Sequence, residues 1–261
     1  MRFRIDMSYS GEGFCGWQIQ PDAPSVQGAL EEALATLLKS PVSVTGAGRT
    51  DTGVNASRYV AHFDFPDSID TPLLVYRLNA ILPPTVAISS ISEVPDDFHA
   101  RFSATRREYS YFLHRSKNPF LNGRSYYYGY PDLDFGKMNE AAGLLVGTRD
   151  FSCFEKKGAD NKTSVCTIFE ARWLPCREET ESGEPTEWMF RIAGDRFLRN
   201  MVRAIVGTLL ELGRGKRTLE DFSRLLDGGA RTDAGESVPG YALFLSGVEY
   251  GEQFLHMDST R

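Results

Sequence analysis

Residues 46–53 read GAGRTDTG, and strand-like sequence lies on both sides of this octapeptide. Residues 42–44 (VSV) precede it, and residues 59–65 (YVAHFDF) follow it. The pattern predicts two strands joined by a tight loop that exposes Asp51 and holds Arg49 close to it. Glycines in such a loop permit backbone angles that other residues avoid and allow a large ligand to approach. Because short loops on rigid scaffolds often carry chemistry, this unit is the first candidate for a site.

Outward from this loop, the first half of the chain predicts the element order β-α-β-β-α-β. Residues 3–9 alternate like a strand, and Ser25 is a good N-cap for a helix that runs to about residue 39. Residues 72–82 predict a second helix, which begins with proline and ends before a Pro-Pro pair, and residues 86–94 predict another strand. This order is that of the ferredoxin-like plan.

The second half, from about residue 105, again combines strands and helices. Strands are predicted at 108–113, 165–174, 188–193 and 241–250, and helices at 135–145, 197–212 and 219–226. The glutamate-rich residues 177–187 predict a solvated hairpin tip. Two similar halves, at 1–104 and 105–261, indicate a pseudo-symmetric α+β protein. We expect helices on one face of each sheet and a cleft between the halves.

Composition limits the class of protein. Of the 261 residues 41% are hydrophobic and 25% charged, which is typical of a soluble globular protein and not of a disordered one. We find neither an apolar run near the roughly 20 residues of a membrane-spanning helix nor a signal peptide, so we expect a cytoplasmic protein. The formal net charge of −6 argues mildly against nucleic-acid binding. It does not exclude such binding, which depends on a local basic patch.

The cysteines and histidines do not predict a metal site. Cys15, Cys153, Cys166 and Cys176 form no CxxC pair, and the four histidines are scattered along the sequence. A zinc site needs clustered ligands at short spacings. We therefore expect reduced, mostly structural thiols and no metal.

Two interpretations of Asp51 are open. Beside Arg49 its carboxylate can stay ionised and act as a nucleophile or base, or it can cap a turn. A near copy of the motif, ARTDAG, occurs at 230–235, where it follows a helix end and has no strand immediately on either side. We expect this copy to be a mobile loop and Asp233 to have a surface role.

Residues 98–111 (FHARFSATRREYSY) interleave arginines with aromatic residues. Guanidinium groups bind phosphates and rings stack on bases, so the pattern suits nucleic acid. The alternative is an ordinary strand with one aromatic core face and one solvated face. We favour that alternative for Tyr111 and Phe112.

Arg203 stands in an otherwise apolar helical stretch, four residues after Arg199 and on the same helical face. A buried arginine is rarely unpaired, so we expect it to meet a carboxylate. The partner is either an ordinary core carboxylate or Asp51 across the cleft.

Taken together, these segments resemble the tRNA pseudouridine synthase A (TruA) family over nearly the whole chain. The matching blocks are YSG at 9–11, FCGWQIQ at 14–20, AGRTDTGV at 47–54, FHARFSA at 98–104, DFS at 150–152 and MVR at 201–203. The resemblance implies two ferredoxin-like halves that form an extended antiparallel sheet with helices on one face and a central basic cleft. It also implies that tRNA uridine is isomerised without a metal or organic cofactor.

The resemblance assigns a role to each catalytic position. Asp51 matches the family's catalytic aspartate, the proposed nucleophile at C1′ or at C6 of the base, or the promoter of a glycal intermediate. Arg49 matches the loop arginine that helps to take the uridine out of the stack. Tyr109 matches the tyrosine that stacks on the uracil and handles the C5 proton. Arg203 matches the arginine that pairs with the aspartate, and Leu243 is placed as an apolar wall beneath the base.

The resemblance also implies the partners. Family members are homodimers that bind the anticodon stem-loop of tRNA and modify uridines 38, 39 and 40. With a net charge of −6, this chain needs a focused basic patch for that binding. The residues that we expect in the patch are Arg49, Arg58, Arg101, Arg106, Arg107 and Arg199.

The chain departs from the family pattern after Val54. The family usually has His-Ala/Gly-x-Gly-Gln there, whereas residues 55–59 read NASRY, and Ala242-Leu243 replaces a usual Gly-Leu. Two rival functions remain: an RNA-binding module without turnover, and a glycoside or nucleoside hydrolase. A hydrolase normally needs a second carboxylate as acid, and the motif blocks show none beside Asp51.

Overall fold

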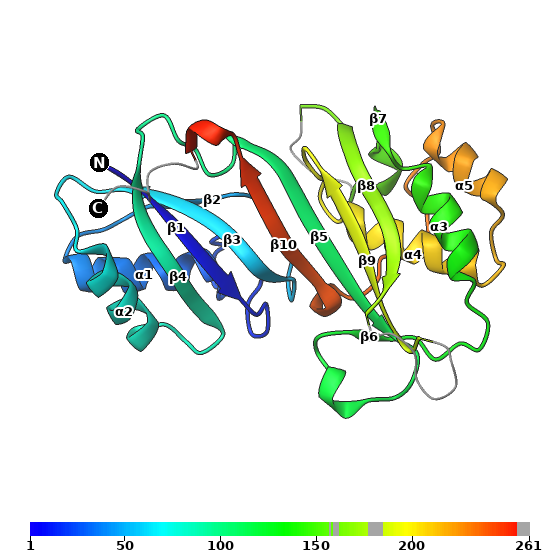
Figure 1. The fold of residues 1–261 in the computed structure, drawn as a ribbon, viewed down its shortest axis with the longest axis horizontal. Helices are drawn as coiled ribbons and strands as arrows, with labels where there is room; N and C mark the ends of the chain where they lie inside the picture. The colour runs from blue at the N-terminus through cyan, green and yellow to red at the C-terminus, as the bar shows by residue number, and fades with distance from the viewer. Residues whose placement is uncertain (157, 159–161, 177–184, 255–261) are drawn as a thin grey trace. The chain divides into compact units, whose positions relative to one another are not determined.

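The computed structural model describes residues 1–156, 158, 162–176 and 185–254. The chain forms two compact units: unit 1 comprises Met1–Arg107 with Phe244–Arg261, and unit 2 comprises Glu108–Leu243. Strands β5 (Ala104–His114) and β10 (Leu243–Tyr250) each have residues in both units (Figure 1).

Unit 1 has the predicted order of elements. They are β1 (Arg2–Tyr9), α1 (Val26–Leu38), β2 (Val44–Gly46), β3 (Asn55–Asp64), α2 (Thr71–Ile81) and β4 (Val86–Val94). Its strands follow the spatial order β4-β1-β3-β10-β5. Strand β1 is antiparallel to both β3 and β4. Strand β2 pairs antiparallel with one end of β3, and β10 pairs parallel with the other end.

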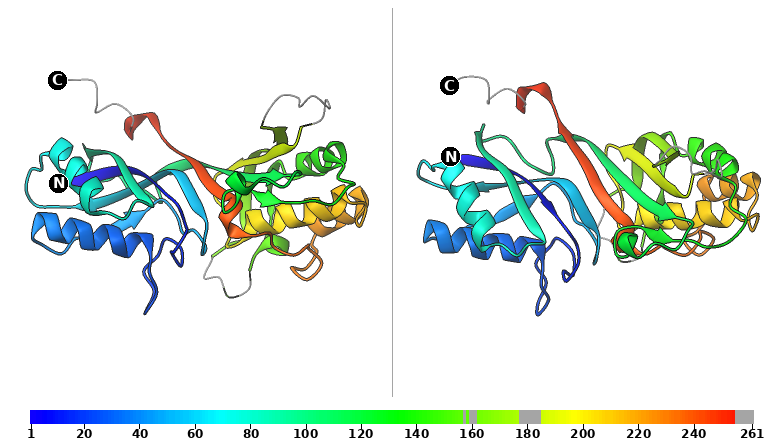
Figure 2. Two further views of the ribbon diagram at one scale, coloured as in Figure 1. Left: turned by 90° about the horizontal axis from the view of Figure 1, so that it is seen from below. Right: turned by 60° about the horizontal axis from the view of Figure 1, so that its bottom comes forward.

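Local signals explain why these residues form these elements. Alternate residues of β1 are buried, as expected for a sheet with one covered face. Helix α1 lies along one side of the unit 1 strands (Figure 2) and buries an apolar stripe at helical spacing. The Ser25 side chain accepts a hydrogen bond from the Gly28 N–H at 3.2 Å, which satisfies a free donor of the first turn. Asp70 caps α2 in the same way through the Leu73 N–H at 3.0 Å.

Unit 2 is built on the order β5-β9-β8-β7, with β6 pairing parallel to β5. Its other elements are β6 (Tyr126–Tyr127), α3 (Phe135–Gly143), β7 (Gly147–Asp150), β8 (Val165–Pro175), β9 (Glu187–Gly194), α4 (Met201–Gly213) and α5 (Leu219–Leu226). Helix α3 packs on β8, and the three helices pack on one another. The predicted α+β class and mostly antiparallel sheet are confirmed.

Some element boundaries differ from those predicted. Helix α4 begins at Met201, not at residue 197, because Asn200 adopts a left-handed φ of 65°. The Asp195 side chain also accepts the Arg196 N–H at 2.7 Å, which favours a turn. Strand β3 begins at Asn55, four residues earlier than expected, and β10 begins at Leu243 after a short 3-10 turn.

The predicted hairpin tip at 177–187 falls mainly on residues 177–184, which lie outside the described residues. The strands on either side of it, β8 and β9, pair antiparallel. None of the helices in the described ranges has the length and apolar character that crossing a membrane requires.

Candidate active site

The predicted site residues divide between the two units. Unit 1 holds Arg49, Asp51, Arg58, Arg101, Arg106 and Arg107, and unit 2 holds Tyr109, Arg199, Arg203 and Leu243.

The loop at 47–54 joins β2 to β3. It ends in a tight turn in which the Val54 N–H donates to the Asp51 carbonyl at 3.1 Å. Gly53 has a φ of 74°, which glycine adopts without a steric penalty. Asp51 is half-buried and Arg49 is exposed, so the loop presents a carboxylate and a guanidinium on a constrained backbone.

Thr50, the residue before Asp51, is fixed by the opening segment of the chain. Its hydroxyl shares a 2.9 Å hydrogen bond with the hydroxyl of Tyr9. Its carbonyl accepts the Trp17 N–H at 3.2 Å. A Cβ on Gly16 would lie 2.4 Å from the same carbonyl oxygen, and Gly16 has a φ of 101°. Only glycine allows that approach, so residues 9–17 are a support for the loop.

Asn55 and Tyr59, two of the residues at 55–59 that depart from the family pattern, form the other support of the loop. The side chain of Asn55 is buried and accepts the Gly11 N–H at 2.8 Å. The buried Tyr59 donates a hydrogen bond from its hydroxyl to the Gly48 carbonyl. The Tyr59 ring also packs on Trp17, with 4.2 Å between the ring centroids. Asn55 and Tyr59 thus hold the loop from inside unit 1.

Arg107 ties the start of the loop to the segment before β5. Its guanidinium donates to the Ala47 carbonyl from Nε at 3.4 Å and from Nη2 at 3.2 Å. It also donates to the Ala104 carbonyl at 3.3 Å and to the Arg101 carbonyl. These bonds fix the loop and residues 101–104 to each other.

The remaining unit 1 arginines differ in their surroundings. Arg58 and Arg101 are exposed. Arg106 is half-buried, and its Nε lies 3.5 Å from Oε1 of Glu249.

In unit 2, Tyr109 and Arg203 are half-buried and held by neighbours. The Tyr109 ring meets Phe197 edge to face, with centroids 5.1 Å apart and planes at 82°. The Arg203 Nε donates to the Val238 carbonyl at 2.8 Å, and the Val238 N–H donates to the Arg203 carbonyl at 3.2 Å. Leu243 is buried at the start of β10. Arg199 is exposed just before α4.

The near copy at 230–235 behaves differently from the first motif. Asp233 is exposed, and its carboxylate accepts the Ala230 N–H at 2.8 Å, which confirms the predicted surface role. The loop is nevertheless not the loose segment that we expected. The Gly235 N–H donates to the Thr208 hydroxyl at 2.9 Å. A Cβ on Gly207 would lie 1.8 Å from the Glu236 carbonyl oxygen, so the chain packs directly on α4.

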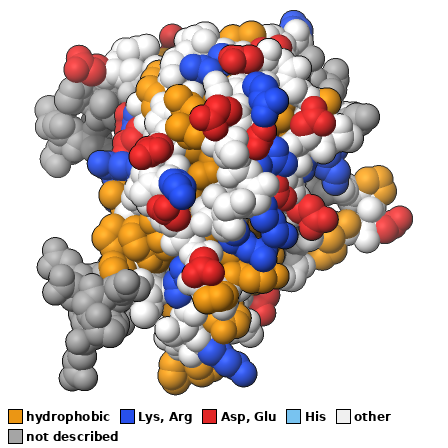
Figure 3. Space-filling view, turned by 90° about the vertical axis from the view of Figure 1, so that its right-hand side faces the viewer, with side chains coloured by type: hydrophobic (Ala, Val, Ile, Leu, Met, Phe, Trp, Pro, Cys, Tyr) orange, Lys and Arg blue, Asp and Glu red, His pale blue; other side chains and the backbone are white. Residues whose placement is uncertain are grey.

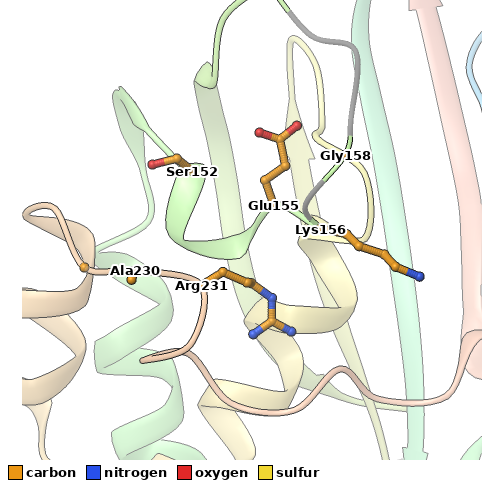
Figure 4. A pocket seen from close by; sticks show the side chains of 7 residues that line it. Ser152, Glu155, Lys156, Gly158, Ala230 and Arg231 are labelled. Atoms are coloured by element: carbon orange, nitrogen blue, oxygen red, sulfur yellow. The ribbon is translucent and has the colours of Figure 1, made fainter.

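A separate hollow of about 280 Å³ lies beside this second loop. It is lined by Ser152, Glu155, Lys156, Gly158, Gly229, Ala230 and Arg231 (Figure 4). Lys156 extends away from Glu155 and Arg231 in this view. The hollow contains none of the predicted site residues, and its mixed charges favour no ligand of a single sign. The face of the molecule in Figure 3 likewise mixes acidic and basic side chains.

The described residues include no group of three or more His, Cys, Asp or Glu that could hold a metal ion. Within the described residues, none of the four cysteines forms a disulfide bond. Burial raises the thiol pKa of Cys153 to about 11 and that of Cys166 to about 12, so both are neutral at pH 7. His62 is buried, and its Nδ1 accepts the Ala100 N–H at 3.2 Å.

Among the curated proteins that are similar to this chain are one from Bacteroides thetaiotaomicron, one from Porphyromonas gingivalis and one from Bacillus subtilis. All three are named tRNA pseudouridine synthase A. The one from Bacteroides thetaiotaomicron is 47% identical over 260 residues, which is 100% of this chain and 94% of the relative. The one from Porphyromonas gingivalis is 47% identical over 95% of this chain and 97% of its own length. The one from Bacillus subtilis is 42% identical over 96% and 99%, respectively.

A family described as tRNA pseudouridine synthase matches residues 141–251. A similar solved chain comes from a structure titled "Crystal Structure of a Cbf5-Nop10-Gar1 Complex". It is 11% identical, covers 79% of this chain and 54% of its own length, and has a TM-score of 0.33.

Proposed function

The chain belongs to the tRNA pseudouridine synthase A family, and we propose that Asp51 is the carboxylate through which it isomerises uridine in tRNA. The enzyme is an isomerase that acts on the anticodon stem-loop, at the family positions 38, 39 and 40. The N1–C1′ bond of uridine breaks, the uracil turns, and C5 bonds to C1′. The proton leaves C5 and N1 gains one, so no redox partner is required.

The support of the Asp51 loop is the observation that carries this proposal. Thr50 is held on one side of Asp51 by Tyr9 and Trp17, and Val54 closes the turn on the other side. A nucleophile gains most when its position is fixed before the substrate arrives. The half-buried carboxylate beside Arg49 meets that condition for attack at either C1′ or C6.

The other catalytic roles that we propose are those that the family resemblance implies, and the environment of each residue is compatible with its role. The exposed Arg49 inserts into the base stack of the tRNA and helps to extrude the uridine. Extrusion costs a few kcal/mol because the base is unstacked. Tyr109, oriented by Phe197, stacks on the uracil and handles the C5 proton. Arg203 is anchored at the Val238 carbonyl, and we propose, as the family resemblance implies, that it pairs with Asp51 and orients the carboxylate. Leu243 supplies an apolar wall for the base.

The basic residues bind the tRNA backbone. Exposed Arg58, Arg101 and Arg199 contact phosphates directly, together with half-buried Arg106. Arg107 acts by holding the loop, because its donors meet backbone carbonyls. We place the enzyme in the cytoplasm as a homodimer. Its sequence has two halves, 1–104 and 105–261, and the end of the second half, from Phe244, belongs to unit 1. Sedimentation equilibrium of the free protein tests the dimer, and a monomer at micromolar concentration would contradict it.

Tritium release from tRNA labelled at C5 of uridine tests the function. We expect release by the wild type and a loss of at least about 1000-fold in Asp51→Ala. Asp233→Ala is the matched control, because it removes the aspartate of the near-copy motif, and it should retain activity. Binding without release would indicate a silent RNA-binding module, and free uracil would indicate a hydrolase.

A further inference from the structure

Phe102 is a large apolar side chain that unit 1 exposes to solvent. It lies in the turn between β4 and β5 (Figure 1), where 75% of its surface is accessible. Its neighbours Phe98 and Ala100 in the same turn are fully buried. Because the turn buries two residues and exposes the phenyl ring next to Arg101, it holds that ring outward.

The backbone of this turn is rigid. The Ala100 N–H donates to His62 at 3.2 Å, and the Ala100 carbonyl accepts the hydroxyl of the buried Tyr250 at 2.7 Å. The N–H groups of Arg101 and Phe102 both donate to Nδ1 of His99, each at 3.2 Å. Phe102 therefore projects from a fixed support and not from a loose loop.

Two flat groups flank the Phe102 ring. The His99 imidazole lies 4.4 Å from it between centroids, with planes at 34°. The Arg101 guanidinium carbon lies 5.5 Å from the ring centroid. Burial, followed by the nearby Arg2, lowers the pKa of His99, so its imidazole is neutral at pH 7. The platform, defined as His99, Arg101 and Phe102, thus combines two uncharged rings with one cation.

The platform is braced against the catalytic loop. Arg107 donates to the Arg101 carbonyl and to the Ala47 carbonyl, where the loop begins. Because one guanidinium joins both segments within unit 1, the platform keeps a fixed position relative to the start of the loop.

We propose that the platform stacks an unpaired base of the bound tRNA, while Arg101 contacts the adjacent phosphate. Unstacked RNA bases are commonly bound by aromatic and arginine planes. This subsite rests on the proposed function and adds to it a contact outside the uridine pocket. An additional stacked base offsets part of the cost of extruding the uridine.

The test measures RNA affinity and the environment of single bases. Synthetic anticodon stem-loops carry 2-aminopurine at one unpaired position each, and fluorescence reports stacking while anisotropy gives Kd. Binding to the wild-type protein should strongly quench the 2-aminopurine fluorescence at one of these positions. Phe102→Leu keeps an apolar side chain without the ring, and it should raise Kd about 5- to 100-fold and remove the quenching. Phe102→Trp should preserve both.

Phe120→Leu is the matched control, because Phe120 is 89% exposed and belongs to unit 2, whereas the platform belongs to unit 1, and this variant should bind RNA like the wild type. Absence of release by the wild type would refute the proposed function, whereas equal affinity and quenching in Phe102→Leu would refute only the platform. A changed sedimentation coefficient with unchanged RNA affinity would show that Phe102 joins two copies of the chain, and would also overturn the proposal.

Discussion

The hydroxyl of Tyr59 donates a hydrogen bond to the carbonyl oxygen of Gly48, which joins the interior of unit 1 to the loop that carries Asp51. The Tyr59 ring fills the space beside Trp17 and Tyr9. A Cβ on Gly46 would lie 2.1 Å from the same hydroxyl oxygen, so strand β2 passes very close to it. Tyr59 therefore supports the loop in two separate ways, through the packing of its ring and through the hydrogen bond of its hydroxyl.

Tyr59→Phe removes the hydroxyl and keeps the ring. We expect a loss of about 1 kcal/mol in the free energy of unfolding, because the Gly48 carbonyl loses a partner. Single-turnover tritium release should fall several-fold, because the loop before Asp51 is less constrained. Urea unfolding and release at saturating tRNA measure the two effects, and an unchanged rate would contradict the supporting role of the hydroxyl.

Gly16→Ala tests the other support of the loop. The new Cβ would lie 2.4 Å from the Thr50 carbonyl oxygen, and the positive φ of 101° adds backbone strain. Gly13→Ala is the control, because Gly13 also has a positive φ (80°) but open space around its Cβ position.

Both variants carry the backbone penalty of roughly 1–2 kcal/mol. Only Gly16→Ala displaces Thr50, so we expect its single-turnover rate to fall at least about 10-fold below that of Gly13→Ala. The stability and the rate of the two variants are compared by thermal unfolding and by single-turnover tritium release, measured on the same preparations. Equal rates for the two variants would show that the approach of Gly16 to Thr50 does not position Asp51.

Local sequence signals predicted much of the fold. The predicted ranges 86–94 and 219–226 are the observed bounds of β4 and α5. Helix α4 started late because of the left-handed backbone at Asn200, which hydrophobic periodicity does not reveal. Strands β6 and β7, of two and four residues, were missed because they are too short for a periodic signal.

The support of the candidate site could not be predicted in the same way. Tyr9 and Thr50 are 41 residues apart in sequence, and Gly11 and Asn55 are 44 apart. A single sequence does not show which polar groups pair over such separations. The glycines and aromatic residues of the opening segment were the available signal, because a close approach of two backbones requires glycine.

His62 predicts an acid-dependent loss of stability. Burial, followed by Arg2 and His99, lowers its pKa to about 4, and the ordinary value is 6.5. The unfolded chain therefore binds this proton first as the pH falls. The contribution of neutral His62 to the free energy of unfolding is fully present above about pH 6.5. It is lost progressively toward pH 4, and the loss amounts to about 2 kcal/mol after allowance for solvent screening.

His62→Asn keeps an acceptor for the Ala100 N–H but removes the titration. We expect the free energy of unfolding of this variant, measured in urea at intervals from pH 7 to pH 4, to fall less steeply than that of the wild type. His114→Asn is the comparison, because burial also lowers the pKa of His114 but that group lies in unit 2. Identical slopes for His62→Asn and the wild type would contradict the assignment.

Arg199 tests whether the exposed arginines contact phosphates. A phosphate contact releases counterions, so the plot of log affinity against log salt should lose about one unit of slope in Arg199→Gln. Arg224→Gln is the control, because Arg224 is exposed on α5 but already paired with Asp221, and its slope should match the wild type. Filter binding of tRNA from about 50 to 200 mM salt measures both variants. A slope for Arg199→Gln equal to that of the wild type would remove Arg199 from the tRNA-binding surface, and a flat profile for the wild type would argue against electrostatic binding altogether.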